Sequence, residues 1–244
     1  PYVLENKGRI TAAALNKPTN SDIYSTQMAE FVDTIGRIAQ PDYLPYSFFV
    51  EGGALGVENA LKTAFDWKVR KNLAAGKDKK GSKVIHFREC FHGRTGYTMS
   101  LTDSPDPRKT LYFPQFEWPS INNPKLHFPL TDEVLEHILK AEATAINQIK
   151  SAVAENPDDI ASLIIEPIQG EGGDNHFRGE FLQELRALAD EHEFMLIYDE
   201  VQTGVGITGK MWAHQLFNSS ARPAIISFGT QTKQCGMFAG QRVA

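Results

Sequence analysis

The fold of this chain is constrained most by two consecutive strand-like segments that lead into acidic residues. Residues 161–168 (ASLIIEPI) run into a glycine-rich turn that carries Glu171, and residues 194–198 (FMLIY) run directly into Asp199. Between them, residues 179–191 place apolar side chains at helical spacing, so the unit is typical of strand, helix, strand. Such a crossover makes the strands parallel and brings their carboxyl ends to one edge of the sheet, where ligands bind in open α/β sheets.

An aspartate at that edge has two interpretations. Most such residues are solvated strand ends or helix caps. The alternative is that Asp199 is the carboxylate that keeps the pyridine nitrogen of pyridoxal phosphate (PLP) protonated, as that cofactor requires to act as an electron sink. Asp199 alone does not decide between them, but an anion site and a histidine elsewhere in the chain favour the cofactor.

The composition is that of an ordinary globular protein. The chain has 244 residues, of which 41% are hydrophobic and 23% charged, and its net charge of -5 argues against a nucleic-acid partner. No apolar run approaches membrane-spanning length, and the two cysteines, Cys90 and Cys235, indicate a reducing compartment. We therefore expect a cytoplasmic protein without a membrane or nucleic-acid partner. The absence of an initial Met suggests a piece of a longer chain.

Strands alternate with helices along the sequence, which predicts an α/β fold with a mainly parallel central sheet flanked by helices. Short apolar runs predict further strands, and amphipathic runs predict further helices. The strands are expected at 47–50, 83–88 and 223–228, and the helices at 25–39, at 132–154 and after Gly53. Residues 103–129 are rich in proline and aromatic residues without a period, which is typical of a functional loop.

The small-residue turn Gly52-Gly53-Ala54 lies between a strand and a helix start. Unshielded N–H groups at a helix N-terminus form an anion site suited to a phosphate. The simpler interpretation is a tight turn in which glycines permit positive φ, and taken alone the turn favours that interpretation.

The segment Phe91-His92-Gly93-Arg94 follows the predicted strand at 83–88. An aromatic ring there can stack on a flat cofactor, and the planar guanidinium of Arg94 matches a carboxylate. The alternatives are a loop histidine held by backbone groups and a surface cation. The remaining histidines lack metal-ligand spacing, so no metal site is expected.

Four motifs in order resemble the class III, or ω, aminotransferases of PLP fold type I. They are Gly52-Gly53-Ala54, Phe91-His92-Gly93-Arg94, Glu166-Pro167-Ile168-Gln169-Gly170-Glu171-Gly172-Gly173 and Asp199-Glu200-Val201-Gln202-Thr203-Gly204. The resemblance covers nearly all of the chain. Three segments, FFVEGGALGVENALK, LNKPTNSDIYS and IQGEGGDNHF, most resemble the family members that act on L-lysine.

The resemblance implies a role for each motif residue. Gly53 and Ala54 would hold the cofactor phosphate, and His92 or Phe91 would stack on its ring. Asp199 would pair with the pyridinium nitrogen, and Gln202 with the phenolic oxygen. Arg94 would bind the α-carboxylate of the substrate, and Glu171 would be the acidic gate that distinguishes amino donor from amino acceptor.

The implied reaction is transfer of the terminal amino group of L-lysine to 2-oxoglutarate, which gives a semialdehyde and L-glutamate. GABA or ornithine is the alternative amino donor. The resemblance also implies a homodimer, an N-terminal segment at 1–45 with an amphipathic helix, and a PLP-binding large domain at 46–244. The small domain that follows in the family is absent from this sequence.

One position departs from the family. The lysine that bonds to the cofactor is expected just after the strand at 223–228, but Thr230 stands there, and a hydroxyl cannot form a Schiff base. Lys233 is the nearest amine and therefore the candidate catalytic lysine. Three explanations remain open: Lys233 acts from a shifted turn, the protein is a non-catalytic PLP-fold binder, or the sequence is locally incorrect.

Overall fold

The computed structural model describes residues 1–16, 24–232 and 234–244, and its centre is a seven-stranded sheet. The strand order is β1-β9-β8-β7-β4-β2-β3. From β8 to β3 neighbouring strands are parallel, whereas β9 is antiparallel to β8 and β1 is antiparallel to β9. The strands are β1 (Tyr46–Val50), β2 (Lys83–Phe87), β3 (Ser120–Ile121), β4 (Ile160–Ile165), β7 (Met195–Asp199), β8 (Ile225–Phe228) and β9 (Cys235–Ala239).

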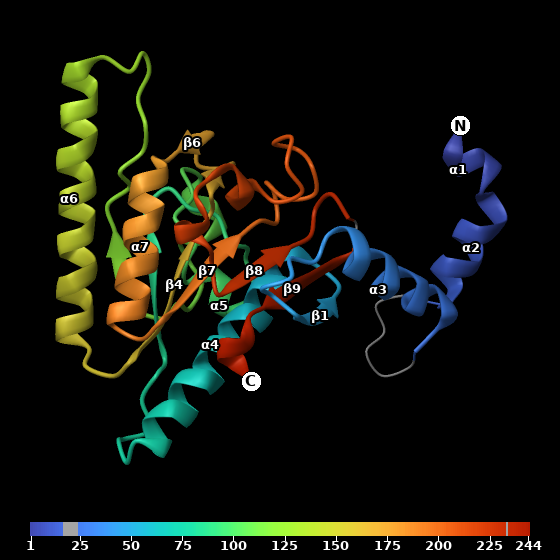
Figure 1. The fold of residues 1–244 in the computed structure, drawn as a ribbon, viewed down its shortest axis with the longest axis horizontal. Helices are drawn as coiled ribbons and strands as arrows, with labels where there is room; N and C mark the ends of the chain where they lie inside the picture. The colour runs from blue at the N-terminus through green and yellow to red at the C-terminus, as the bar shows by residue number, and fades with distance from the viewer. Residues whose placement is uncertain (17–23, 233) are drawn as a thin grey trace.

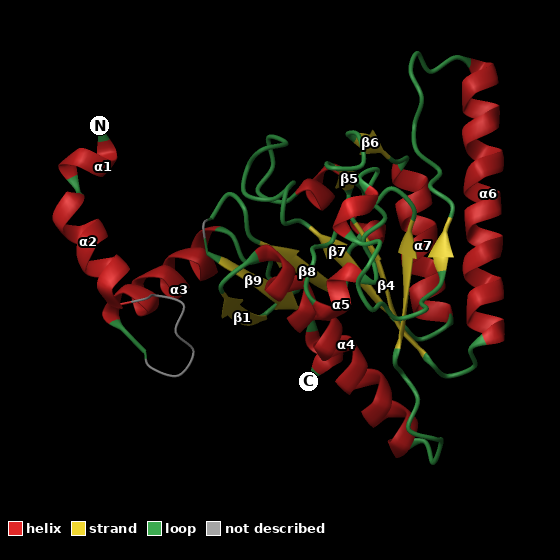
Figure 2. Cartoon of the chain, turned by 180° about the vertical axis from the view of Figure 1, so that it is seen from behind, coloured by secondary structure: helices red, strands yellow, loops and turns green. Residues whose placement is uncertain are grey.

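Helices cover both faces of this sheet, so the predicted α/β fold with a mainly parallel sheet is confirmed (Figures 1 and 2). The helix α4 (Gly53–Ala74) packs on one face, and α6 (Asp132–Glu155) and α7 (Gly179–Glu191) pack on the other. Side chains alternate between two cores along β4, where Ile164 contacts the α4 side and Ile165 the α7 side. This alternation explains why the strand is buried throughout and apolar at every position except Ser162.

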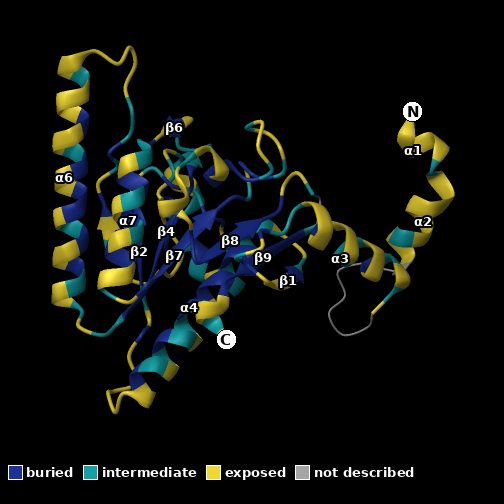
Figure 3. Cartoon of the chain, viewed as in Figure 1, coloured by how far each residue is buried: buried dark blue, intermediate teal, exposed yellow. Residues whose placement is uncertain are grey.

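The predicted strand–helix–strand unit is present, and it lies at the middle of the sheet. The strands β4 and β7 are parallel neighbours, with Ile165 opposite Tyr198, and α7 connects them. The apolar stripe of α7 is buried while its outer face is exposed (Figure 3). The carboxyl ends of β4 and β7 therefore meet at one edge, with Glu166 following the first and Asp199 ending the second.

Several boundaries differ from the sequence expectations. The strand predicted at 161–168 ends at Ile165, because Pro167 has no N–H to continue a ladder. Residues Ile168–Gln169 instead form β5, which pairs with β6 (Asn175–His176) in a small separate hairpin. The edge strand β1 is antiparallel to its neighbour, and β9 has no counterpart among the predicted strands.

Helices in the N-terminal segment extend to one side of the sheet (Figure 1). The helix α3 (Thr26–Ile38) confirms the amphipathic helix expected at 25–39, and the side chain of Ser25 caps its N-terminus. Its Phe31 contacts Phe49 of β1, with ring centroids 5.2 Å apart, so α3 shares the main core. Two further helices, α1 (Tyr2–Glu5) and α2 (Lys7–Asn16), were not predicted and expose most of their residues.

The helices of the described residues include none with the length and apolar character needed to cross a membrane. The same residues contain no group of three or more His, Cys, Asp or Glu side chains that could hold a metal ion. Small helical turns complete the fold, and they are α5 (Gly96–Met99), η1 (Pro107–Lys109), η2 (Ala213–Leu216), η3 (Ser219–Ala221) and η4 (Gln241–Val243).

Candidate active site

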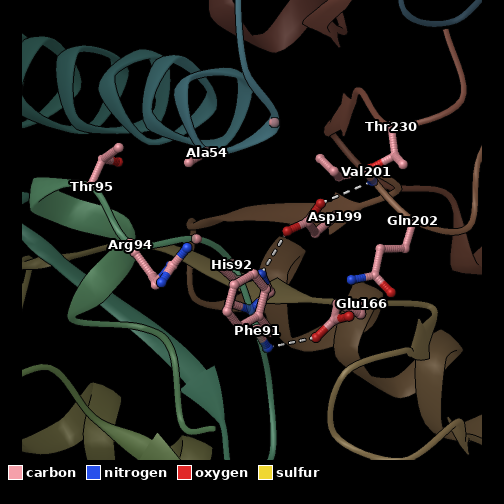
Figure 4. A pocket seen from close by; sticks show the side chains of 12 residues that line it. Ala54, Phe91, His92, Arg94, Thr95, Glu166, Asp199, Val201, Gln202 and Thr230 are labelled. Atoms are coloured by element: carbon pink, nitrogen blue, oxygen red, sulfur yellow. Dashed lines mark hydrogen bonds and ion pairs between the residues drawn. The ribbon is translucent and has the colours of Figure 1, made fainter. Parts of the chain in front are cut away.

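A cavity of about 410 Å³ opens at the carboxyl edge of the parallel strands, where four motifs meet (Figure 4). Its lining comes from the start of α4, from the segment after β2, and from the ends of β4, β7 and β8. The lining residues are Gly53, Ala54, Phe91, His92, Gly93, Arg94, Thr95, Glu166, Asp199, Val201, Gln202 and Thr230. The fold thus brings together the residues predicted at Gly53, Ala54, Phe91, His92, Arg94, Asp199 and Gln202.

Asp199 is buried and held by three hydrogen bonds. Its Oδ1 accepts from the backbone N–H of Val201 at 3.0 Å and from the hydroxyl of Ser227 at 3.0 Å. Its Oδ2 lies 2.8 Å from Nδ1 of His92 (Figure 4). These contacts fix the carboxylate on the wall of the cavity, so Asp199 is more than a solvated strand end.

His92 lines the cavity and supports Asp199 through their hydrogen bond. Burial disfavours the charged imidazole, but the nearby Cys90 and the hydrogen bond to Asp199 outweigh it and raise the pKa of His92 well above its usual value. The side chain of His92 has no exposed surface, but His92 and Phe91 both line the cavity. That one of these two rings stacks on a cofactor ring stays a prediction.

The first turn of α4 presents backbone N–H groups at the cavity. The preceding Gly52 has φ 102° and supplies no side-chain cap. A Cβ on Gly53 would lie 2.6 Å from Cγ1 of Val201, and one on Gly93, where φ is 123°, would lie 2.5 Å from Cβ of Ala54. Glycine is therefore required at both positions. Because no side chain caps the helix, the N–H groups of its first turn are open to an anion.

Glu166 also lines the cavity. It belongs to one of the four sequence motifs, but the sequence predicted no role for it. Its Oε1 accepts from the N–H of Phe91 at 2.8 Å and its Oε2 from the N–H of Gly170 at 3.2 Å. The pKa of Glu166 is raised to about 7, mainly by burial; the charge of His92 opposes this rise and the charge of Asp199 contributes to it. The available signal in the sequence was Pro167, which ends the strand and so places Glu166 at the strand end. Nothing in the sequence indicated that three other residues line the cavity, namely Gly93, Thr95 and Val201.

Arg94 is exposed at the cavity, and its guanidinium makes no hydrogen bond or ion pair within the described part of the chain. It is thus available to bind an anionic ligand. Glu171 does not line the cavity; it lies in the β5–β6 hairpin and forms an ion pair with Lys109. Lys233 lies outside the described residues. Thr230 lines the cavity, and its backbone N–H donates to the carbonyl of Val201 at 3.1 Å.

Comparison with known proteins agrees with this geometry. Residues 11–243 match the family model described as aminotransferase class-III, so the chain belongs to the class III aminotransferase family. It is 51% identical over 240 residues to the L-lysine-epsilon aminotransferase of Mycobacterium tuberculosis, a match that covers 98% of this chain and 52% of that protein. The corresponding enzyme of Amycolatopsis lactamdurans is 46% identical over 236 residues, covering 97% and 52%.

A solved structure of lysine aminotransferase from M. tuberculosis superposes with a TM-score of 0.91 at 50% identity, over 98% of this chain and 54% of that one. The chain therefore spans about half the length of the relatives it matches. The family is PLP-dependent, and the residues fit that cofactor in two respects: an open helix N-terminus suits its phosphate, and a buried carboxylate suits its ring nitrogen. The described lining residues do not include a lysine to bond with it.

Proposed function

We propose that the full-length protein transfers the terminal amino group of L-lysine to 2-oxoglutarate, giving a semialdehyde and L-glutamate. The observation that carries this proposal is the convergence of three groups at one cavity: the open N-terminus of α4, the fixed carboxylate of Asp199 and the unpaired guanidinium of Arg94. The names of the relatives at 45–51% identity support lysine as the amino donor.

Each group has a distinct role in this proposal. The N–H groups of Gly53 and Ala54 hold the phosphate of PLP, and Gln202 donates to its phenolic oxygen. When bound, PLP supplies an electron sink for the carbon that exchanges its amino group. Asp199 keeps the ring nitrogen protonated, and His92 keeps Asp199 oriented through its hydrogen bond.

The substrate contacts follow from charge. Arg94 binds the α-carboxylate through its planar fork. Glu171 acts as the acidic gate between amino donor and amino acceptor. We further propose that the protein is a cytoplasmic homodimer, and that GABA or ornithine is the alternative donor.

A second candidate function rests on Thr230. Amino transfer needs an amine that bonds the cofactor and moves a proton between carbons, and a hydroxyl cannot replace it. A non-catalytic PLP-binding protein of the same fold is therefore the alternative, since Thr230 lines the cavity. Lys233 is our candidate for the missing amine.

Two measurements on the full-length protein test these candidates. Incubation with excess PLP should give a visible absorbance band that Asp199→Ala weakens, and the absence of any band in the wild type would defeat the proposal. Borohydride reduction makes a bond between the cofactor and a lysine amine permanent. Peptide mass mapping should then find the pyridoxyl group on Lys233.

Two other results of the peptide mass mapping would distinguish the remaining explanations for Thr230. A pyridoxyl group at position 230 would show that a lysine stands there and that the sequence is locally incorrect. Bound PLP without any modified residue would favour the non-catalytic protein.

A further inference from the structure

A buried carboxylate, that of Glu200, closes a short turn that lines the cavity. Glu200 directly follows the last residue of β7, and its side chain has no exposed surface. Its backbone carbonyl accepts from the N–H of Gly204 at 2.9 Å, and its Oε2 accepts from the hydroxyl of Thr203 at 2.8 Å. Val201 and Gln202 lie within the turn that these bonds close, and both line the cavity (Figure 4).

The start of η2 anchors the same carboxylate from outside the turn. Its Oε2 also accepts from the N–H of Ala213 at 2.8 Å. Its Oε1 accepts from the N–H of His214 at 2.9 Å and lies 2.8 Å from Nδ1 of that residue. The Nε2 atom of His214 forms a hydrogen bond with the hydroxyl of Tyr43. One carboxylate therefore holds both ends of the segment 201–212 at the end of β7.

The position of Gln202 depends on this turn. Its side chain makes no hydrogen bond within the described part of the chain, and it lies against Gly170, where an added Cβ would be 1.9 Å from its Oε1. The backbone before it is fixed, because the carbonyl of Val201 accepts from the N–H of Thr230 at 3.1 Å. The place of the Gln202 amide in the cavity is therefore set by the backbone of the turn and by the contact with Gly170.

We propose that Glu200 is a positioning residue, whose buried carboxylate fixes the turn so that the amide of Gln202 meets the phenolic oxygen of the cofactor. This inference rests on the proposed function, which assigns that contact to Gln202. A carboxylate suits the place because it can accept from all four donors that surround it, whereas the side chain of glutamine would turn an NH2 group toward one pair of them.

The first measurement is hydrogen exchange of the full-length protein without cofactor, read from overlapping peptides by mass spectrometry. The amides of Gly204 and Thr230 report on the turn, because they bond to its backbone and not to the carboxylate. In Glu200→Gln they should exchange about tenfold faster, as expected for loss of hydrogen bonds to a charged group. The amides of β4 should keep their rates, which separates a local opening from global destabilisation.

The second measurement is the absorbance of bound PLP, which responds to hydrogen bonds at its phenolic oxygen. Glu200→Gln should shift the absorbance maximum in the same direction as Gln202→Ala, which removes the amide itself. The double variant should match Gln202→Ala alone, because Glu200 acts on the cofactor through Gln202.

A milder variant and a matched control complete the test. Thr203→Val removes one bond within the turn and keeps the carboxylate, so it should give both effects at reduced size, and it serves where Glu200→Gln does not fold. Glu142→Gln is the control, because Glu142 is also a buried carboxylate, bonded to Arg178 at 2.8 Å, but lies on α6 and does not line the cavity. It should change neither the exchange of the turn nor the absorbance.

Unchanged exchange at Gly204 and Thr230 in Glu200→Gln would overturn the inference, and so would faster exchange that leaves the absorbance of bound PLP unchanged. A further shift in the double variant would also overturn it, because Glu200 would then act on the cofactor by a route other than Gln202. The failures of the two proposals are distinguishable. A wild type without the PLP band defeats the proposed function and this inference with it, whereas a normal band with unchanged exchange in Glu200→Gln defeats only the role of Glu200.

Discussion

Arg94 is the only arginine or lysine among the described residues that line the cavity, so its contribution to ligand binding can be isolated. Arg94→Lys keeps the charge but removes the planar fork. We expect it to weaken lysine binding by about 1.5–3 kcal/mol, the range for hydrogen bonds to charged groups, while PLP affinity stays nearly unchanged. Calorimetry for lysine and absorbance titration for PLP measure the two effects.

A matched control is Arg70→Lys, because Arg70 forms an exposed ion pair with Asp66 on α4. It should leave both affinities unchanged. An equal loss of PLP and lysine binding in Arg94→Lys would instead assign Arg94 a structural role.

Glu166 predicts a pH dependence of stability in the cofactor-free protein. Burial raises its pKa from 4.5 to about 7, so the folded state favours the protonated carboxyl. Below pH 4.5 both states are protonated and this stabilisation is complete. As the pH rises toward 7 the unfolded chain releases its proton first, so the folded state loses stability relative to it.

The measurement is the free energy of unfolding of the wild type minus that of Glu166→Gln. This difference should fall by on the order of 3 kcal/mol between pH 4.5 and 7.5 and then stay constant. A difference that is constant over the whole range would show that Glu166 has the same pKa in the folded and unfolded states.

At the scale of elements, the β5–β6 hairpin places Glu171 through close packing of its backbone. A Cβ on Gly172 would lie 1.9 Å from the carbonyl oxygen of Glu89, which is backbone and cannot move cheaply. We expect Gly172→Ala to destabilise the protein by about 1–3 kcal/mol, the usual cost of overpacking.

Chemical denaturation of the wild type and the variant checks this prediction. Gly36→Ala is the control, because a Cβ there meets only Oε1 of Gln40 at 3.9 Å on the exposed side of α3. A Gly172→Ala variant with wild-type stability would mean that the hairpin is not held by this contact.

At the scale of the whole molecule, the aromatic loop from Leu111 to Trp118 exposes several apolar side chains. Phe116 and Trp118 stack with ring centroids 5.1 Å apart and an angle of 12° between planes. Tyr112 is 87% exposed, Phe113 52% and Phe116 51%. Apolar side chains so exposed and so close together are typical of an interaction surface.

We therefore expect the full-length protein to form a homodimer with this loop at or near the interface. Light scattering should give the mass of a dimer, and Tyr112→Lys/Phe113→Lys should shift the equilibrium toward monomer. The control Leu15→Lys changes an exposed apolar residue of α2 away from the loop. A stable wild-type monomer with activity on lysine would contradict the dimer and the role of the loop.

Much of the fold and the cavity was predictable because local patterns encode it. The helical spacing of Phe181 and Leu185 predicted α7, and both side chains are buried. The parallel crossover then required Asp199 to lie at the ligand edge, and the structure places it on the cavity wall. Short elements were missed, since β3 and β6 contain two residues each and so have no period to detect.

By itself, the sequence determined the strand–helix–strand unit, the edge at which the motifs gather and, through the order of those motifs, the family. Only the tertiary structure decided which side chains meet there: His92 bonds Asp199 across 107 positions, and Lys109 pairs with Glu171 across 62. Periodicity records which face of an element is buried. It does not record which distant segment packs against that face, because such pairs form only when the whole sheet has brought its loops to one edge.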